Sequence, residues 1–258
     1  MLIARDITVT LARRDILHGV DFTALPGRIT AIVGPNGSGK TTLMRALTGE
    51  YAPRRGQVTL AGADLSTLSP RDLAPRRAVL EQATSVGFAF SLREVVRMGA
   101  EAGHAAPIPD LPERALAEVG LAHRIDGWFS QLSGGEQARC HLARVRAQVW
   151  HPVHRGRASW LMVDEPVAAL DIGHQLQVMR LLRGFADAGG GVVAVMHDLN
   201  LSAMFADTML LMEDGRILSQ GSPAEVMTEA RLSAAYGCRL CVNRAPESGV
   251  WLLPQMAH

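Results

Sequence analysis

Gly34-Pro35-Asn36-Gly37-Ser38-Gly39-Lys40-Thr41 is the stretch that decides the fold. It fits the pattern G-x-x-x-x-G-K-[ST] and lies between a short apolar run, residues 29–33, and a helix-like segment, residues 42–47. A buried strand, a glycine-rich turn and a helix in this order let successive N–H groups face one anion at a helix N-terminus. The alternative is a glycine-rich turn that binds no ligand, but such a turn does not require a strand before it and a helix after it. The predicted phosphate site comprises Gly34, Pro35, Asn36, Gly37, Ser38, Gly39, Lys40, Thr41 and Thr42.

A second apolar run, residues 160–163, ends in two carboxylates, Asp164 and Glu165. Many core strands end in an acidic turn, so this run alone decides little. Beside a phosphate loop it predicts a function: Lys40 reaches the β- and γ-phosphates, Thr41 and Asp164 hold Mg²⁺, and Glu165 polarises the attacking water. The predicted cofactors are therefore ATP and Mg²⁺.

Bulk composition excludes several classes of protein. Lys and Arg total 26 against 25 Asp and Glu, so net charge does not suggest nucleic acid as a partner. No apolar run approaches the roughly 18 residues that a membrane span needs, and Arg5 and Asp6 interrupt the place of a signal-peptide core. Three cysteines make no disulfide framework, and Cys238 and Cys241 are expected to be incidental thiols. We expect a globular α/β chain in a reducing compartment.

The order of patterns predicts one domain over residues 1–258 with a helical insertion. Alternating apolar residues near the start predict antiparallel strands, and residues 58–65 predict a further strand with a turn at Gly62. Ser91 and Glu94 form a predicted capping box, and a second helix is expected from Glu113 to Gly120. A closing hairpin is expected around residues 214–215. The expected parts are a nucleotide-binding α/β core (1–82 and 151–220), a helical subdomain (83–150) and a C-terminal extension (221–258).

The stretch Leu132-Ser133-Gly134-Gly135-Glu136-Gln137 resembles the signature of ABC ATPases. An ordinary helix cap could use the same residues, but this one lies between the two nucleotide motifs, as in that family. The resemblance implies a P-loop NTPase (RecA-like) core with an antiparallel β subdomain and an inserted α-helical subdomain. It also implies a head-to-tail homodimer, in which each signature contacts the γ-phosphate held by the opposite subunit. The implied contacts are Ser133, Gly134, Gly135 and Glu136.

Other positions match the same family one by one. Gln82 resembles the glutamine that links the nucleotide metal to the helical subdomain, and His197 resembles the switch histidine at the γ-phosphate. Asp171 in Ala169-Leu170-Asp171 resembles the D-loop aspartate. The family often stacks an aromatic on adenine where this chain has Leu11. The resemblance thus implies Glu165, His197 and Gln82 as catalytic residues, and Thr41, Gln82 and Asp164 as metal ligands.

Two segments narrow the resemblance to importers of metal chelates. Residues 79–99 and 197–201 resemble those ATPases, and residues 147–160 resemble the longer corresponding segment of haemin-import ATPases. His151 and His154 in that segment are expected on a solvated loop. The implied partners are two membrane permease subunits and, indirectly, a periplasmic haemin-binding protein. Phe88 and Phe90 are candidate permease contacts, with core positions as the alternative for both. The implied location is peripheral, on the cytoplasmic face of the inner membrane. The alternatives are a ferric-siderophore or cobalamin importer, an exporter ATPase, and a non-transport ABC ATPase.

Overall fold

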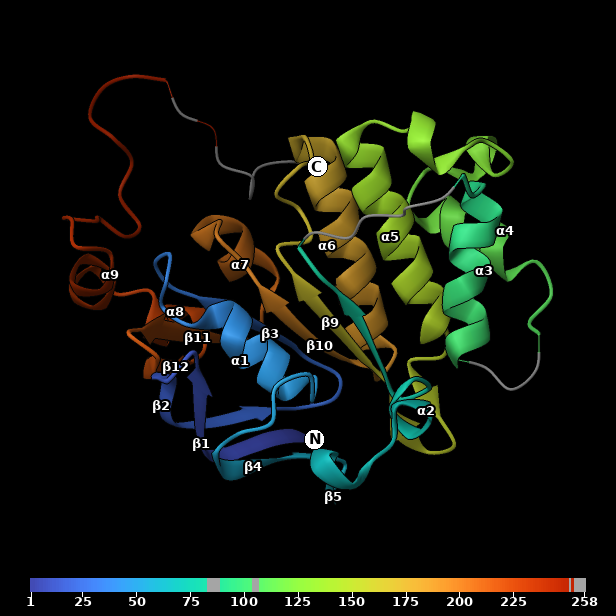
Figure 1. Cartoon of the computed structure of the whole chain (residues 1–258). Coiled ribbons are helices and arrows are strands. Elements are labelled where there is room, and N and C mark those ends of the chain that lie inside the picture. The colour runs from blue at the N-terminus through green and yellow to red at the C-terminus, as the bar shows by residue number, and fades with distance from the viewer. Residues whose placement is uncertain (83–88, 104–106, 251, 253–258) are drawn as a thin grey trace.

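A six-stranded sheet forms the centre of the computed structural model, which describes residues 1–82, 89–103, 107–250 and 252 (Figure 1). The strand order is β12-β11-β3-β10-β9-β6. The hairpin β11–β12 is antiparallel, and the other pairs in this order are parallel. The strands are β3 (Ile29–Val33), β6 (Arg77–Leu80), β9 (Trp160–Asp164), β10 (Gly191–Val195), β11 (Thr208–Glu213) and β12 (Arg216–Gly221).

Both faces of this sheet are covered, which explains why β3, β9 and β10 are buried along their whole length and are largely apolar. All five residues of β3 are buried. Ala31 and Val33 pack into a cluster with the helical side of the molecule, whereas Ile32 packs with α1 and the antiparallel sheet. This division follows from the alternation of side chains along a strand. The covering helices include α1 (Lys40–Leu47), α6 (Ile172–Asp187) and α7 (Leu199–Phe205).

A four-stranded antiparallel sheet with the order β2-β1-β4-β5 packs beside α1 (Figure 1). It confirms the strands predicted from the alternation at the start of the chain and around Gly62. The predicted closing hairpin is also confirmed, with Asp214 and Gly215 both at positive φ in its turn. The strands are β1 (Leu2–Leu11), β2 (Arg14–Ala24), β4 (Arg55–Leu60) and β5 (Ala63–Asp64).

The helical layer contains α3 (Leu92–Gly103), α4 (Leu111–Glu118) and α5 (Gly134–Gln148). The capping box ahead of α3 is confirmed, because Glu94 Oε2 accepts from Ser91 N–H and Oγ at 2.8 Å each. The predicted second helix is confirmed, but both of its ends lie two residues earlier than the expected bounds of about Glu113 and Gly120. Pro112 fits inside the first turn, where a helix needs no donor, so α4 begins before it.

Several further elements complete the chain. The edge strand β6 was not predicted, and residues 153–158 form a short hairpin where a plain loop was expected. The proposed permease contact Phe88 and the proposed start of the helical subdomain at residue 83 lie outside the described residues. Across the described chain, each helix is too short or too polar to span a bilayer. The remaining elements are α2 (Pro70–Leu73), β7 (Val153–His154), β8 (Arg157–Ala158), α8 (Pro223–Val226) and α9 (Glu229–Tyr236).

Candidate nucleotide site

The residues predicted to bind nucleotide follow the C-terminal ends of neighbouring parallel strands. Gly34 follows β3, Gln82 follows β6, Glu165 follows β9 and His197 follows β10. Because parallel strands point the same way, these four ends meet at one edge of the sheet, where open α/β sheets bind their ligands. Four segments that are far apart in sequence are thus brought to one place by the topology.

The phosphate loop is held open by its backbone. Gly34 has a φ of 149°, and a Cβ there would lie 2.2 Å from the carbonyl oxygen of Met212, so a larger residue does not fit. Gly39 has a φ of 98° and caps α1. At the tip of the loop, Asn36 and Gly37 are exposed, which leaves room for an anion over the start of α1.

Lys40 places its charge across this loop. Its Nζ donates to the carbonyl oxygens of Gly34 and Pro35 at 2.9 Å each. The side chain is 6% exposed, and burial lowers the pKa of the ammonium, while Glu165 and Asp164 oppose that shift. A phosphate oxygen can replace either loop carbonyl as the acceptor, which suits Lys40 for the predicted contact.

Asp164 and Thr41 offer a site for a hard cation. Asp164 is buried at the end of β9, and burial raises the pKa of its carboxyl against the opposing effects of the Thr41 hydroxyl and the Lys40 ammonium. Its Oδ1 has no hydrogen-bond partner within the described chain. A buried carboxylate oxygen without a donor, beside a hydroxyl and a phosphate loop, fits the way proteins hold Mg²⁺ through one or two oxygens.

Two side chains form hydrogen bonds with the Glu165 carboxylate. Gln82 Nε2 donates to Glu165 Oε2 at 2.8 Å, and His197 Nε2 is hydrogen-bonded to Oε1. The Glu165 side chain is 11% exposed and its φ is 53°, so the backbone turns sharply to aim the carboxylate into the site. The structure therefore joins all three residues predicted to be catalytic, and the positive φ at a bulky residue marks the place as unusual.

The signature residues cap the N-terminus of α5, the helix to which they belong. Ser133 and Glu136 form a capping box at α5, in which Glu136 Oε2 accepts from Ser133 N–H at 2.9 Å. Arg124 donates to the other carboxylate oxygen at 2.8 Å. The Ser133 hydrogen bonds and then Arg124 lower the pKa of Glu136 to about 2. Within one chain these groups satisfy each other; contact with a partner's phosphate stays a prediction.

A cavity of about 350 Å³ connects the signature helix with the catalytic edge. Gly134 and Gln137 of α5 line it together with Gln82, Asp164 and Glu165. Asp171, the proposed D-loop residue, instead caps α6 and accepts from His174 Nδ1 at 2.7 Å. Its role between subunits stays a prediction.

Two residues near the site were not found from the sequence. Tyr236 of α9 is hydrogen-bonded to the backbone of Gly34, and burial raises the pKa of its hydroxyl. His141 of α5 is buried, lines the 350 Å³ cavity and has its ring 4.9 Å from that of Phe129. Tyr236 comes about 200 residues after the loop it touches, and neither residue stands in a motif. Leu11, which stands where the family often has an aromatic that stacks on adenine, is half-buried at the end of β1.

The sequence matches the family model "ABC transporter" over residues 17–168. The chain belongs to this family. This ABC protein is also 55% identical over 259 residues to the Hemin import ATP-binding protein HmuV of Jannaschia sp. (strain CCS1), covering 100% of this chain and 96% of that one. It is 55% identical over 256 residues to the protein of the same name from Roseobacter denitrificans, covering 99% and 98%.

Solved structures confirm the fold expected for an ABC ATPase. A dimeric ATP-binding cassette in a post-hydrolysis state with ADP and Pi superimposes with a TM-score of 0.75 at 22% identity, covering 86% of this chain and 99% of that one. A nucleotide-free cassette gives a TM-score of 0.74 at 20% identity, covering 92% and 95%. At these identities the likeness concerns the fold alone.

Proposed function

We propose that this chain is the ATP-hydrolysing subunit of an ABC importer that moves haemin across the cytoplasmic membrane. The hydrolytic part rests on the hydrogen bonds from Gln82 and His197 to the Glu165 carboxylate. Beside them, Asp164 Oδ1 has no hydrogen-bond partner within the described chain. The haemin part rests on 55% identity over nearly full length to proteins named for haemin import.

Each site residue has a distinct task in this proposal. Lys40 and the loop amides bind the β- and γ-phosphates, and Thr41, Asp164 and Gln82 hold Mg²⁺, which neutralises developing charge on the phosphates. Glu165 accepts the proton of the attacking water. Each of its oxygens accepts one hydrogen bond here and keeps a further lone pair with which it can accept from water. The His197 side chain is 44% exposed and can turn toward the γ-phosphate without unpacking the core.

Two exposed helix starts support the proposed assembly. The signature residues Ser133, Gly134, Gly135 and Glu136 lie at the start of α5 and Asp171 lies at the start of α6; Ser133, Gly134 and Asp171 are exposed, so a second subunit can face them even though these residues also cap their own helices. We infer a head-to-tail homodimer that lies peripherally on the cytoplasmic face and docks on two permease subunits, through which haemin delivered by a periplasmic binding protein passes. Phe90 is half-buried and stays a proposed permease contact.

Transport into proteoliposomes tests this function. The chain is reconstituted with its co-purifying permease and binding protein, and haemin, a ferric siderophore and cobalamin are compared under ATP. Haemin-selective uptake that disappears with Glu165→Gln is the expected result. Selective uptake of another chelate overturns the substrate and leaves the ATPase, whereas uptake that persists in Glu165→Gln overturns the catalytic assignment.

A further inference from the structure

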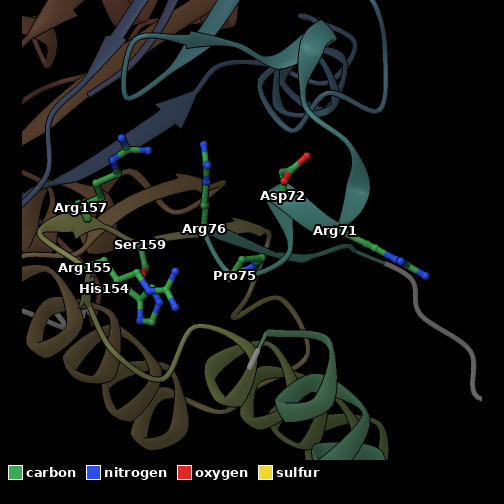
Figure 2. A pocket seen from close by; sticks show the side chains of 9 residues that line it. Arg71, Asp72, Pro75, Arg76, His154, Arg155, Arg157 and Ser159 are labelled. Carbon is green, nitrogen blue, oxygen red and sulfur yellow. The ribbon is translucent and has the colours of Figure 1, made fainter. Parts of the chain in front are cut away.

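A cavity of about 440 Å³ is drawn in Figure 2. It lies at the N-terminal ends of strands in the central sheet, whereas the nucleotide site lies at their C-terminal ends. It is formed where Arg76 and Ser159 precede the paired first residues of β6 and β9. Since β9 has five residues, the two edges are separated by roughly 13 Å along the strands. Six residues with ionisable side chains line the cavity: Arg71 and Asp72 from α2, Arg76 from the segment between α2 and β6, and His154, Arg155 and Arg157 from the hairpin β7–β8.

The positive charge in this cavity is poorly matched. Four arginines and one aspartate line it, and within the described chain no ion pair joins Arg155 or Arg157 to a carboxylate. Asp72 accepts from Ser69 Oγ at 2.6 Å and Ser69 N–H at 3.1 Å, which lowers its carboxyl pKa. It is also attracted to Arg76. The guanidinium groups of Arg76, Arg155 and Arg157 bring more positive charge to the cavity than this one engaged carboxylate offsets, and a bound anion would reduce their mutual repulsion.

Arginine occupies a backbone position in the hairpin that normally favours other residues. Arg155 and Gly156 are the two turn residues between β7 and β8, and their φ values are 50° and 75°. Two-residue hairpins with both φ values positive prefer Asn, Asp or Gly. In Figure 2, Arg76, Arg155 and Arg157 extend from different segments of the cavity wall, and Arg71 points away from them. The turn thus puts a cation at the cavity against local preference.

The walls that carry these side chains are fixed to the sheet. Trp160 N–H donates to the carbonyl oxygen of Arg76 at 2.9 Å. Ser159 is buried, its N–H donates to Pro152 O, and its Oγ donates to His151 O, at 2.8 Å each. Gln148 Nε2 holds the other wall through the carbonyls of residues 74 and 77. Exposed arginine tips on a fixed frame can close on a ligand with little backbone movement.

We propose that this cavity binds a compound with two or more clustered phosphate groups. Guanidinium forks match phosphate oxygens two at a time, and several forks around one space select clustered charge over a single anion. The site is separate from the phosphate loop and does not depend on the proposed transport function. A free oligophosphate and a phosphorylated lipid headgroup carry the same groups, so the test distinguishes these two sources.

Calorimetric titration with inorganic tripolyphosphate, at low ionic strength and with the nucleotide site saturated by ADP, tests the proposal. The wild type is compared with Arg155→Gln/Arg157→Gln and with a control of equal charge change, Arg5→Gln/Arg239→Gln, whose residues are exposed elsewhere. We expect at least about tenfold weaker binding in the cavity variant, since each lost charged hydrogen bond weakens binding strongly, and unchanged affinity in the control. Equal weakening in both variants, or no binding by the wild type to either tripolyphosphate or lipid, overturns the proposal.

Vesicle flotation separates the two sources of phosphate. Vesicles of phosphatidylcholine are compared with vesicles that also contain a phosphatidylinositol bisphosphate. Flotation with the second kind that tripolyphosphate displaces, and that the cavity variant loses, identifies a lipid headgroup; tripolyphosphate binding without flotation identifies a free oligophosphate. Thermal unfolding checks that the cavity variant folds, and Arg157→Lys, which keeps charge but loses the fork, should give an intermediate affinity.

Discussion

The two edges of the central sheet present positive charge in different ways. At the C-terminal ends of the strands, positive charge comes from the backbone N–H groups of a glycine-rich loop and the start of α1, and from one buried ammonium, Lys40. Two carboxylates lie close by. At the N-terminal edge, the charge is carried by the exposed arginine side chains of a short hairpin and of the chain before β6. Backbone geometry builds the first site and side chains build the second. A site of the first kind tolerates almost no substitution, whereas the second should weaken in steps.

Glu165→Gln should give the largest effect and should be confined to the C-terminal edge. A glutamine keeps the shape but cannot accept the proton of water, so ATP turnover should fall about 10²–10⁴-fold. ATP and Mg²⁺ should then accumulate a dimer in size-exclusion chromatography. A variant that remains monomeric with saturating nucleotide would count against the facing arrangement, and tripolyphosphate binding in the presence of ADP should stay unchanged.

Lys40→Ala removes the single side-chain cation of the phosphate loop. Because Lys40 is buried and its charge acts on phosphate in a water-poor place, we expect kcat/KM for ATP to fall about 10²–10³-fold. Arg5→Ala removes an exposed charge on β1 and serves as the control. Unchanged turnover in Lys40→Ala would overturn the assignment of the phosphate site.

How far the sequence could predict each edge follows from the same difference. The loop from Gly34 to Thr41 and the pair Asp164 and Glu165 were found because backbone-built sites need particular residues at fixed spacing. The structure brings Gln82 and His197 to Glu165 as the family resemblance implied, although their roles remain proposals.

The arginine cavity could not be found in that way. Arg76 and Arg157 are some 80 residues apart in sequence and line one cavity only because β6 pairs with β9. The strand β6 itself is a four-residue edge strand without a clear sequence pattern. Tyr236 reaches Gly34 for a similar reason, through the docking of α9. Long-range pairing of this kind leaves no local signal in one sequence.

A pair of glycine substitutions compares the two edges directly. In Gly34→Ala the new methyl would lie 2.2 Å from a main-chain carbonyl at a φ of 149°, so the loop must rebuild and the cost should exceed about 2 kcal/mol. In Gly156→Ala nothing lies within 4 Å, and only the positive φ opposes the change, so about 1 kcal/mol is expected. Denaturant unfolding measures both. Equal costs would contradict the distinction between a backbone-built and a side-chain-built edge.

The smallest expected effect concerns how the free energy of unfolding depends on acidic pH. It arises at the start of α5, which faces the catalytic cavity. The capping box lowers the pKa of Glu136 from 4.5 to about 2, so its carboxylate favours the folded state above pH 4.5, and that contribution is lost as pH falls from 4.5 toward 2. Ser133→Ala removes the hydroxyl that lowers this pKa and should make the free energy of unfolding less steeply dependent on pH in that window.

Ser222→Ala makes the same change in the capping box of α8, away from the nucleotide site, and serves as the matched control. Glu136 also forms an ion pair with Arg124 at 2.8 Å, whereas Arg231 attracts the Glu225 carboxylate without hydrogen-bonding to it, so the Ser133 variant should keep more of its acid sensitivity than the Ser222 variant keeps. Equal loss in both variants would mean that Arg124 adds nothing, and that the signature helix start is an ordinary cap until a second subunit meets it.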